Sequence, residues 1–206
     1  MLAMTLWRGP NTLILASQSR ARQALLAGAG LAFEAIAADI DERAVQQASR
    51  LSAPGEIALL LAREKARLVS LQRVGQFVIG ADQTLALGDR LFTKPEDRAQ
   101  ALDQLRVLAG QRHELHSGIA VAQDGAIVFD HVAIAGMTMR PMSEAELAAY
   151  VEAAGDRVVT SSVGAYQLEG LGVHLFERIE GDHFTILGLP LLPLLGFLRS
   201  RHLLGL

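Results

Sequence analysis

The chain has 206 residues, half of them apolar and one fifth charged, with a formal net charge of −3. This length and composition suit one large domain or two small lobes with a substantial core. The absence of cysteine excludes disulfides, thiolate metal sites and cysteine catalysis, and it fits a reducing compartment. The slightly acidic balance argues against a broad basic surface for a nucleic acid polymer.

Neither end of the chain predicts a secretion signal or a membrane span. Residues 1–10 hold one arginine and no long apolar core, so we interpret them as a ragged start. The most apolar stretch, residues 184–198, includes two prolines and is too short to cross a bilayer. We therefore expect one cytoplasmic domain over residues 1–206, away from any membrane, with a buried C-terminal helix.

The first strand and the helix after it predict an anion site. The apolar run Leu13 to Ala16 breaks into Ser17-Gln-Ser19, and a helix is expected from Gln18 to Ala29. A helix N-terminus offers unpaired N–H groups and partial positive charge. Arg20 and Arg22 add full charges in the first turns. This combination indicates a phosphate site.

The elements that follow alternate at first between strands and helices, and antiparallel strands appear later. Strands are expected at 31–37, 77–81, 115–122, 127–139, 163–170 and 173–179, and helices at 54–71, from Pro95 to Gly110, and at 143–154. The order predicts an α/β fold with a mixed twisted sheet flanked by helices, divided into two lobes with a central cleft.

Carboxylates and cations stand at unusual places along this pattern. Asp39-Ile-Asp-Glu42 follows a predicted strand, and Asp82 directly follows the apolar strand that ends at Ala81. Lys65 falls on the apolar stripe of its helix, and Lys94 precedes Pro95. Simpler interpretations are a snorkelling lysine at Lys65 and a turn-capping aspartate at Asp82.

Together these residues are what metal-assisted hydrolysis of a phosphoanhydride requires. Carboxylates such as Glu42 and Asp82 hold Mg²⁺ or Mn²⁺, which also binds substrate phosphates. Arg22, Lys65 and Lys94 would neutralise charge on phosphorus oxygens, and a free carboxylate can activate water. A Walker P-loop is absent from the sequence, and His113 and His116 have no zincin spacing.

Short motifs in a fixed order make the chain resemble the Maf family of nucleoside triphosphate pyrophosphatases along nearly its whole length. The matching stretches are Leu-Ala-Ser17-Gln-Ser19 with Arg22, Leu25-Leu26, Asp39-Ile-Asp41-Glu42, Lys65-Ala66, Ile79-Gly-Ala-Asp82, Lys94-Pro95, Val163-Gly-Ala-Tyr166, Glu169-Gly170, Ile179-Glu-Gly181 and Gly188-Leu-Pro190.

The resemblance implies a fold related to inosine triphosphate pyrophosphatases. It also implies cleavage of the α–β phosphoanhydride of a nucleoside triphosphate, which gives the monophosphate and pyrophosphate. Asp82 matches the family's proposed proton acceptor, and Glu42 matches its conserved acid. The positions that match its substrate-binding residues are Ser17, Ser19, Arg22, Lys65 and Lys94.

Three positions that the resemblance links to base selectivity depart from its usual pattern. Ala21 replaces an arginine of the opening motif, and Arg20 replaces a proline. At the positions of Gln83 and Glu169, the chain resembles the family branch that acts on 7-methyl-GTP and differs from the branch that prefers thymidine triphosphate. Because that branch tends to carry an aromatic residue at the position of Ala21, the preferred base is left open.

Several alternatives remain beside the pyrophosphatase. Asp82 and Glu42 could divide the metal and base roles in either way, since a metal-bound aspartate is a poor proton acceptor, and Asp39 and Asp41 are close enough in sequence to share the metal. A non-catalytic nucleotide-binding regulator of cell division would bind without turnover, and an unrelated phosphatase would release orthophosphate. A homodimer is the assembly that we consider, because it is common among soluble oligomers.

Overall fold

The structure, a computed structural model, describes residues 6–205. The chain divides into two compact units. Unit 1 comprises the residues up to Gln83, Ser117–Ala133 and the residues from His183 on, and unit 2 comprises Thr84–His116 and Ile134–Asp182. The predicted division into two parts agrees with these units, while the predicted cleft stays a prediction.

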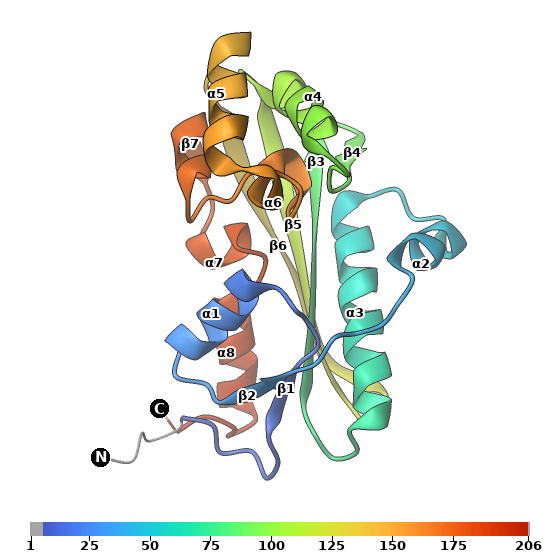
Figure 1. Ribbon diagram of the computed structural model, residues 1–206. Helices are drawn as coiled ribbons and strands as arrows, with labels where there is room; N and C mark the ends of the chain where they lie inside the picture. The colour runs from blue at the N-terminus through green and yellow to red at the C-terminus, as the bar shows by residue number, and fades with distance from the viewer. Residues whose placement is uncertain (1–5, 206) are drawn as a thin grey trace. The chain divides into compact units, whose positions relative to one another are not determined.

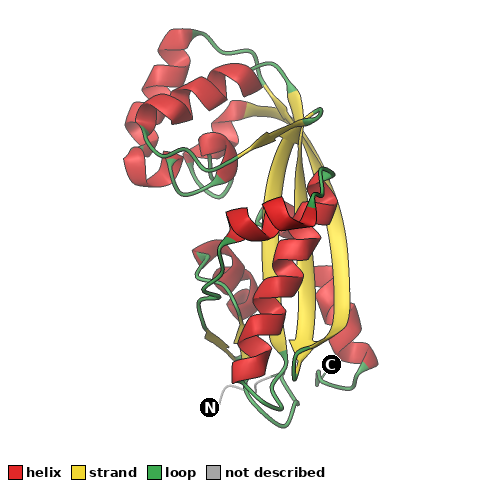
Figure 2. Cartoon of the chain, turned by 90° about the vertical axis from the view of Figure 1, so that its right-hand side faces the viewer, coloured by secondary structure: helices red, strands yellow, loops and turns green. Residues whose placement is uncertain are grey.

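Both units contribute to one mixed seven-stranded sheet of order β2-β1-β3-β5-β6-β7, with β4 paired to β3. Its strands are β1 (Leu13–Leu15), β2 (Phe33–Ala35), β3 (Val78–Leu87), β4 (Arg90–Phe92), β5 (Arg112–Gln123), β6 (Ala126–Met139) and β7 (Phe176–Glu180). β1 runs parallel to β2 and β3, whereas β4 and β7 run antiparallel to their neighbours. The mixed sheet confirms the predicted fold class, and its long strands lie side by side in Figure 2.

Helices cover both faces of the sheet in unit 1. The helices of this unit are α1 (Arg20–Gly28), α2 (Glu42–Ser49), α3 (Pro54–Gln72), α7 (His183–Ile186) and α8 (Leu191–Ser200). Figure 1 shows α3 on one side of β1 and β3, and α1 and α8 on the other. Within residues 6–205, no helix has the length and apolar character needed to cross a membrane.

Alternation along the strands fills two separate cores in unit 1. Leu13 and Leu15 of β1 pack in the cluster that includes Leu26 of α1 and Leu194 of α8. Ile14 lies between them in sequence and packs in a second cluster that includes Val69 of α3. Successive side chains of a strand point to opposite faces, so odd-numbered residues of β1 face α1 and α8 while even-numbered residues face α3.

Small residues bring α3 unusually close to the sheet. A Cβ built on Gly80 of β3 would lie 2.1 Å from the carbonyl oxygen of Ala62, and one built on Gly118 of β5 would lie 2.5 Å from the carbonyl oxygen of Ala58. Only glycine therefore fits at these two strand positions. The close approach places the side chains of α3 against the next even-numbered residue of β3, which is Asp82.

Unit 2 contains the remaining helices and short 3₁₀ turns. They are α4 (Arg98–Leu108), α5 (Glu144–Ala154), α6 (Asp156–Val159), η1 (Val163–Ala165) and η2 (Leu171–Leu175). Helix α5 begins with a capping box, in which Ser143 Oγ accepts from the Glu146 amide while the Glu146 carboxylate accepts from the Ser143 amide.

Four local features differ from the predictions. The sequence pattern missed α2, whose N-cap Asp41 accepts from the amide of Ala44 at 2.9 Å. Helix α4 begins at Arg98 and not at Pro95, because the Asp97 carboxylate caps it through the amide of Gln100 at 2.8 Å. Residues 163–170 form no strand: Gly164 and Ala165 have φ of 79° and 62°, which turn the backbone away from an extended path. Likewise the strand expected at 173–179 begins only at Phe176.

A buried histidine in unit 2 predicts sensitivity to acid. His113 is 0% exposed, its Nε2 lies 2.8 Å from the hydroxyl of Tyr166, and burial lowers its pKa from 6.5 to about 4. Because the unfolded chain binds a proton more tightly than the folded chain, stability falls as the pH drops from 6.5 towards 4. We expect a loss of about 3 kcal/mol over this range.

Urea unfolding at a series of pH values measures this loss. The His113→Phe variant should be less stable at neutral pH, because Tyr166 loses its partner, but its stability should depend less on pH between 6.5 and 4. An unchanged pH slope in the variant would show that another group causes the acid sensitivity.

Candidate active site

Asp82 is the fifth residue of β3 and lies in the middle of the strand, and not after its end as predicted. The prediction was wrong because β3 continues beyond Ala81 to Leu87 through residues that include Gln83 and Thr84, which broke the apolar pattern. Asp82 is 7% exposed. Its position on β3 points its carboxylate to the face covered by α3.

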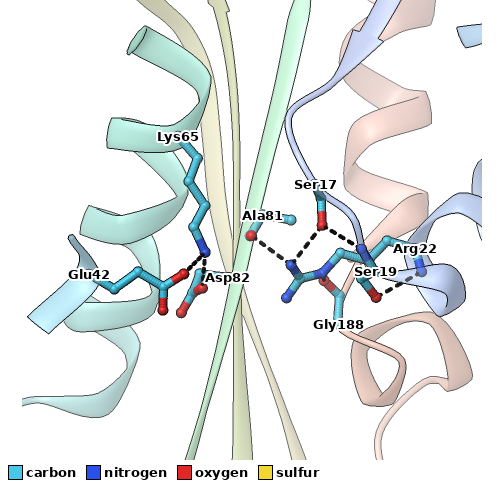
Figure 3. Close-up of polar contacts among 8 residues, drawn as sticks. All are labelled: Ser17, Ser19, Arg22, Glu42, Lys65, Ala81, Asp82 and Gly188. Atoms are coloured by element: carbon cyan, nitrogen blue, oxygen red, sulfur yellow. Dashed lines mark hydrogen bonds and ion pairs between the residues drawn. The ribbon is translucent and has the colours of Figure 1, made fainter. Parts of the chain in front are cut away.

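Lys65 joins the two acidic residues that the sequence singled out. Its Nζ lies 2.6 Å from Asp82 Oδ1 and 2.6 Å from Glu42 Oε1. The side chains of Lys65 and Asp82 are 9% and 11% exposed, whereas that of Glu42 is 53% exposed. Figure 3 shows the lysine reaching down from α3 to the two carboxylates, which come from the start of α2 and from β3. The two carboxylates therefore lie within the reach of a single cation.

Burial and charge act in opposite directions on Asp82. Burial raises its pKa above the usual value, and Glu42 adds to the increase, while Lys65 and Arg22 oppose it. A buried carboxylate is stable only with such partners. A carboxyl with a raised pKa holds a proton better than an exposed aspartate, which suits a proton acceptor.

The turn after β1 has the hydroxyl-rich structure that the sequence predicted. Ser19 caps α1, with its Oγ accepting from the amide of Arg22 at 3.4 Å. Ser17 Oγ accepts from the amide of Ser19 at 3.2 Å. The two hydroxyls and the first turn of α1 thus form a small polar surface where the strand ends.

Arg22 makes contacts that the sequence did not predict. Its Nε donates to the carbonyl oxygen of Gly188 at 2.8 Å, and its Nη1 donates to that of Ala81 at 2.8 Å and to Ser17 Oγ at 3.3 Å. Burial lowers its pKa, while Asp82 and Glu42 oppose that change. Arg22 therefore fastens α1 to β3 and to the turn before α8, and it also places positive charge near Asp82 (Figure 3).

Replacing Arg22 by Lys tests these contacts. Lysine keeps the charge but lacks the planar fork that reaches two carbonyl oxygens at once. We expect the free energy of unfolding to fall by about 1–3 kcal/mol, measured by urea denaturation. The control is Arg20→Lys, two residues earlier in the same helix and exposed, which should change stability by less than about 0.5 kcal/mol. Equal stabilities of the two variants would contradict the role of the fork.

The donor set of Glu42 and Asp82 fits a hard divalent cation. Both offer carboxylate oxygens, and Mg²⁺ is commonly held by one or two carboxylates together with substrate phosphates. Residues 6–205 contain no group of three or more His, Cys, Asp or Glu side chains arranged for a metal. Asp41 caps α2 through Oδ1, and the suggestion that Asp39 and Asp41 share a metal with the other two stays a prediction.

The remaining predicted residues are placed as follows. Ala21 is half-buried in the first turn of α1, and Gln83 is half-buried on β3, on the face opposite to Asp82. Lys94 and Glu169 are exposed residues of unit 2, in the segments that follow β4 and η1. Unit 1 therefore brings together Ser17, Ser19, Arg22, Glu42, Lys65 and Asp82.

Sequence reasoning missed two contacts around the site. Ser117 of β5 is fully buried and contacts Gln83, and the carbonyl oxygen of Gly188 accepts from Arg22. A polar residue inside the apolar run 115–122 was the available signal for Ser117. Gly188 contributes only its main-chain carbonyl oxygen, which every residue has, so the sequence carried no signal for this contact.

Comparisons with known proteins support the family resemblance that the motifs indicated. Residues 12–201 match the family described as Maf-like protein. The chain is 71% identical over 202 residues to a nucleoside triphosphate pyrophosphatase of Bradyrhizobium diazoefficiens, covering 98% of this chain and 100% of that one. It is 66% identical over 202 residues to one of Rhodopseudomonas palustris, with the same coverage.

Two further similarities are more distant. A 7-methyl-GTP pyrophosphatase of Rhizobium etli is 53% identical over 190 residues, covering 91% of this chain and 95% of that one. The solved structure of a HAM1 protein from Coxiella burnetii aligns with a TM-score of 0.40 at 19% identity, covering 62% of this chain and 72% of that one. From the family match and the relatives that share most of its residues over nearly its full length, the chain belongs to the Maf family.

Proposed function

We propose that this Maf-family protein is a nucleoside triphosphate pyrophosphatase, which hydrolyses the α–β phosphoanhydride to the monophosphate and pyrophosphate. The observation that carries the proposal is the buried carboxylate of Asp82, which shares Lys65 with Glu42 and has Arg22 close by. Relatives named as such pyrophosphatases, 71% and 66% identical, support it.

Asp82 acts in this proposal as the proton acceptor for the attacking water. Its Oδ1 accepts from Lys65, which leaves Oδ2 to take the proton. Lys65 holds the carboxylate in one orientation, and burial shields it from bulk water. A general base in a fixed position typically contributes about 10²–10⁴-fold to the rate.

The phosphates are held by the cations and by the turn after β1. Ser17, Ser19 and the first amides of α1 would donate to phosphate oxygens, and Arg22 and Lys65 supply positive charge. Lys94 has a lysine's flexible point charge, and it is assigned to phosphate binding through the family resemblance. We propose that both units belong to a single Maf-like domain.

A divalent cation, Mg²⁺ or Mn²⁺, would be held by Glu42 and Asp82. When bound, it would supply positive charge to the triphosphate oxygens. Glu42 is the more exposed of the two carboxylates, so it can serve as the main ligand while Asp82 keeps Oδ2 for the proton.

One relative suggests a candidate for the preferred nucleobase of the substrate. The 53% identical protein from Rhizobium etli is named a 7-methyl-GTP pyrophosphatase, so 7-methyl-GTP belongs beside the standard triphosphates. Ala21, Gln83 and Glu169 are the positions that we assign to base selection. Ala21 offers no aromatic ring for stacking on a methylated base.

A panel of triphosphates tests the proposed function. The protein is incubated with Mg²⁺ or Mn²⁺ and each of the standard nucleotides or 7-methyl-GTP, and both pyrophosphate and orthophosphate are measured. Pyrophosphate release is expected for at least one nucleotide. Orthophosphate as the first product would indicate a phosphatase, and binding without turnover would indicate a nucleotide-binding regulator.

A further inference from the structure

Ser117 is a buried polar residue to which the proposed mechanism gives no role. It lies on β5 and is 0% exposed. Its Oγ donates to the carbonyl oxygen of Thr185 at 2.7 Å and accepts from Nε2 of Gln83 at 2.8 Å. The Ser117 hydroxyl therefore donates a hydrogen bond to α7 and accepts one from Gln83, the residue that follows Asp82 in the sequence.

The neighbouring carbonyl groups fix which way the Gln83 amide faces. Nε2 also lies 3.1 Å from the carbonyl oxygen of Thr185 and 3.0 Å from that of Ile186. Carbonyl oxygens only accept hydrogen bonds, so a flipped amide would place Oε1 against two acceptors. Nε2 must face α7, and Oε1 lies on the other corner of the amide.

Ser117 is the partner that completes this arrangement. Nε2 has two N–H groups for three acceptors, so one N–H can be shared by the two successive carbonyl groups while the other points at Ser117. Without the hydroxyl, the N–H that points at Ser117 loses its acceptor in this orientation, and the amide must turn if both N–H groups are to reach the two carbonyl oxygens. Arg22 separately holds the carbonyl of Gly188, which fixes the chain just beyond α7.

We propose that Ser117 is a positioning residue of the active site, which locks the side-chain amide of Gln83 with Oε1 available to a ligand. The locked oxygen is an acceptor, so it would recognise an N–H donor of the nucleobase. The effect on base selection rests on the proposed function, in which Gln83 contributes to that selection. The geometry of the amide itself does not depend on it.

The first experiment reads the Gln83 amide by NMR and needs no activity. The side-chain NH₂ signals of Gln83 are identified by their loss in Gln83→Leu. In Ser117→Ala they should shift and lose protection from exchange with water. The matched control is Ser70→Ala: Ser70 is also 0% exposed, donates to the carbonyl of Arg67 at 2.8 Å and accepts from the amide of Gly125 at 3.0 Å. Ser70→Ala should leave the Gln83 signals in place.

The second experiment measures selectivity on the triphosphates that the wild-type protein hydrolyses. Ser117→Ala should change the ratio of kcat/KM between the two best substrates by up to about tenfold, as expected for one hydrogen bond. The change should be absent in Ser70→Ala, and it should disappear when Gln83 is already leucine. Ser117→Cys, which keeps the volume with weaker hydrogen bonding, provides a second variant should alanine impair folding.

The outcomes separate the two proposals. Unchanged Gln83 signals in Ser117→Ala overturn the positioning role, as does a selectivity change that persists in the Gln83→Leu background. A wild-type protein that releases no pyrophosphate overturns the proposed function, while the NMR measurement still decides the role of Ser117.

Discussion

Replacing Asp82 by Asn is expected to lower the kcat for pyrophosphate release by about 10²–10⁴-fold. The amide has nearly the shape of the carboxylate, and its oxygen can still accept from Lys65, but it cannot take a proton from water. Lys65 also keeps its contact with Glu42. The variant should therefore fold, which circular dichroism and urea unfolding would verify.

A second aspartate of unit 1 offers a matched control. Asp130 of β6 accepts from Nε of Arg63 on α3 at 2.6 Å, away from the candidate site. Asp130→Asn makes the same chemical change at another ion pair between α3 and the sheet. It should keep activity close to that of the wild type. Equal activity of both asparagine variants would show that Asp82 is no catalytic base.

Replacing Lys65 by Met is expected to cost about 3–5 kcal/mol of unfolding free energy, because it leaves the buried Asp82 carboxylate without its ion-pair partner. The side chains of Lys65 and Asp82 are both nearly buried, so water cannot replace the lost ammonium fully. The exposed Glu42 should contribute little to this loss, since water solvates its carboxylate. Urea unfolding of the wild type and the variant gives the difference.

The double variant Lys65→Met with Asp82→Asn provides the control for this prediction. A neutral amide needs no cation, so the double variant should regain part of the stability lost in Lys65→Met. Both should be inactive in pyrophosphate release. If Lys65→Met unfolds like the wild type, the ion pair contributes nothing to stability.

Local patterns were enough to predict the elements around the site. The apolar run at Leu13 predicted β1, and the hydroxyl-rich turn after it predicted a helix that starts close to the observed start of α1. Lys65 stood out because it interrupts an apolar helical stripe, and the structure places it against Asp82. These predictions succeeded because the signal for each lay within a short stretch of one helix or strand.

Two features that sequence reasoning missed at the site depend on contacts between distant segments. The sequence cannot show that Arg22 uses its guanidinium on the carbonyl groups of Ala81 and Gly188, because main-chain atoms look alike in every residue. Likewise the polar residues Gln83 and Thr84 suggested the end of a strand. Pairing of β3 with its neighbours extends that strand to Leu87.

Hydrolysis in water enriched in ¹⁸O tests the central claim most directly, since it reports which phosphorus atom is attacked. With the preferred triphosphate and Mg²⁺, attack by water at the α-phosphorus should place the label in the nucleoside monophosphate and leave pyrophosphate unlabelled, as mass spectrometry of both products would show. Asp82→Asn should lower the yield of labelled monophosphate in step with its rate. Label found in pyrophosphate, or orthophosphate released as the first product, would contradict the proposed reaction.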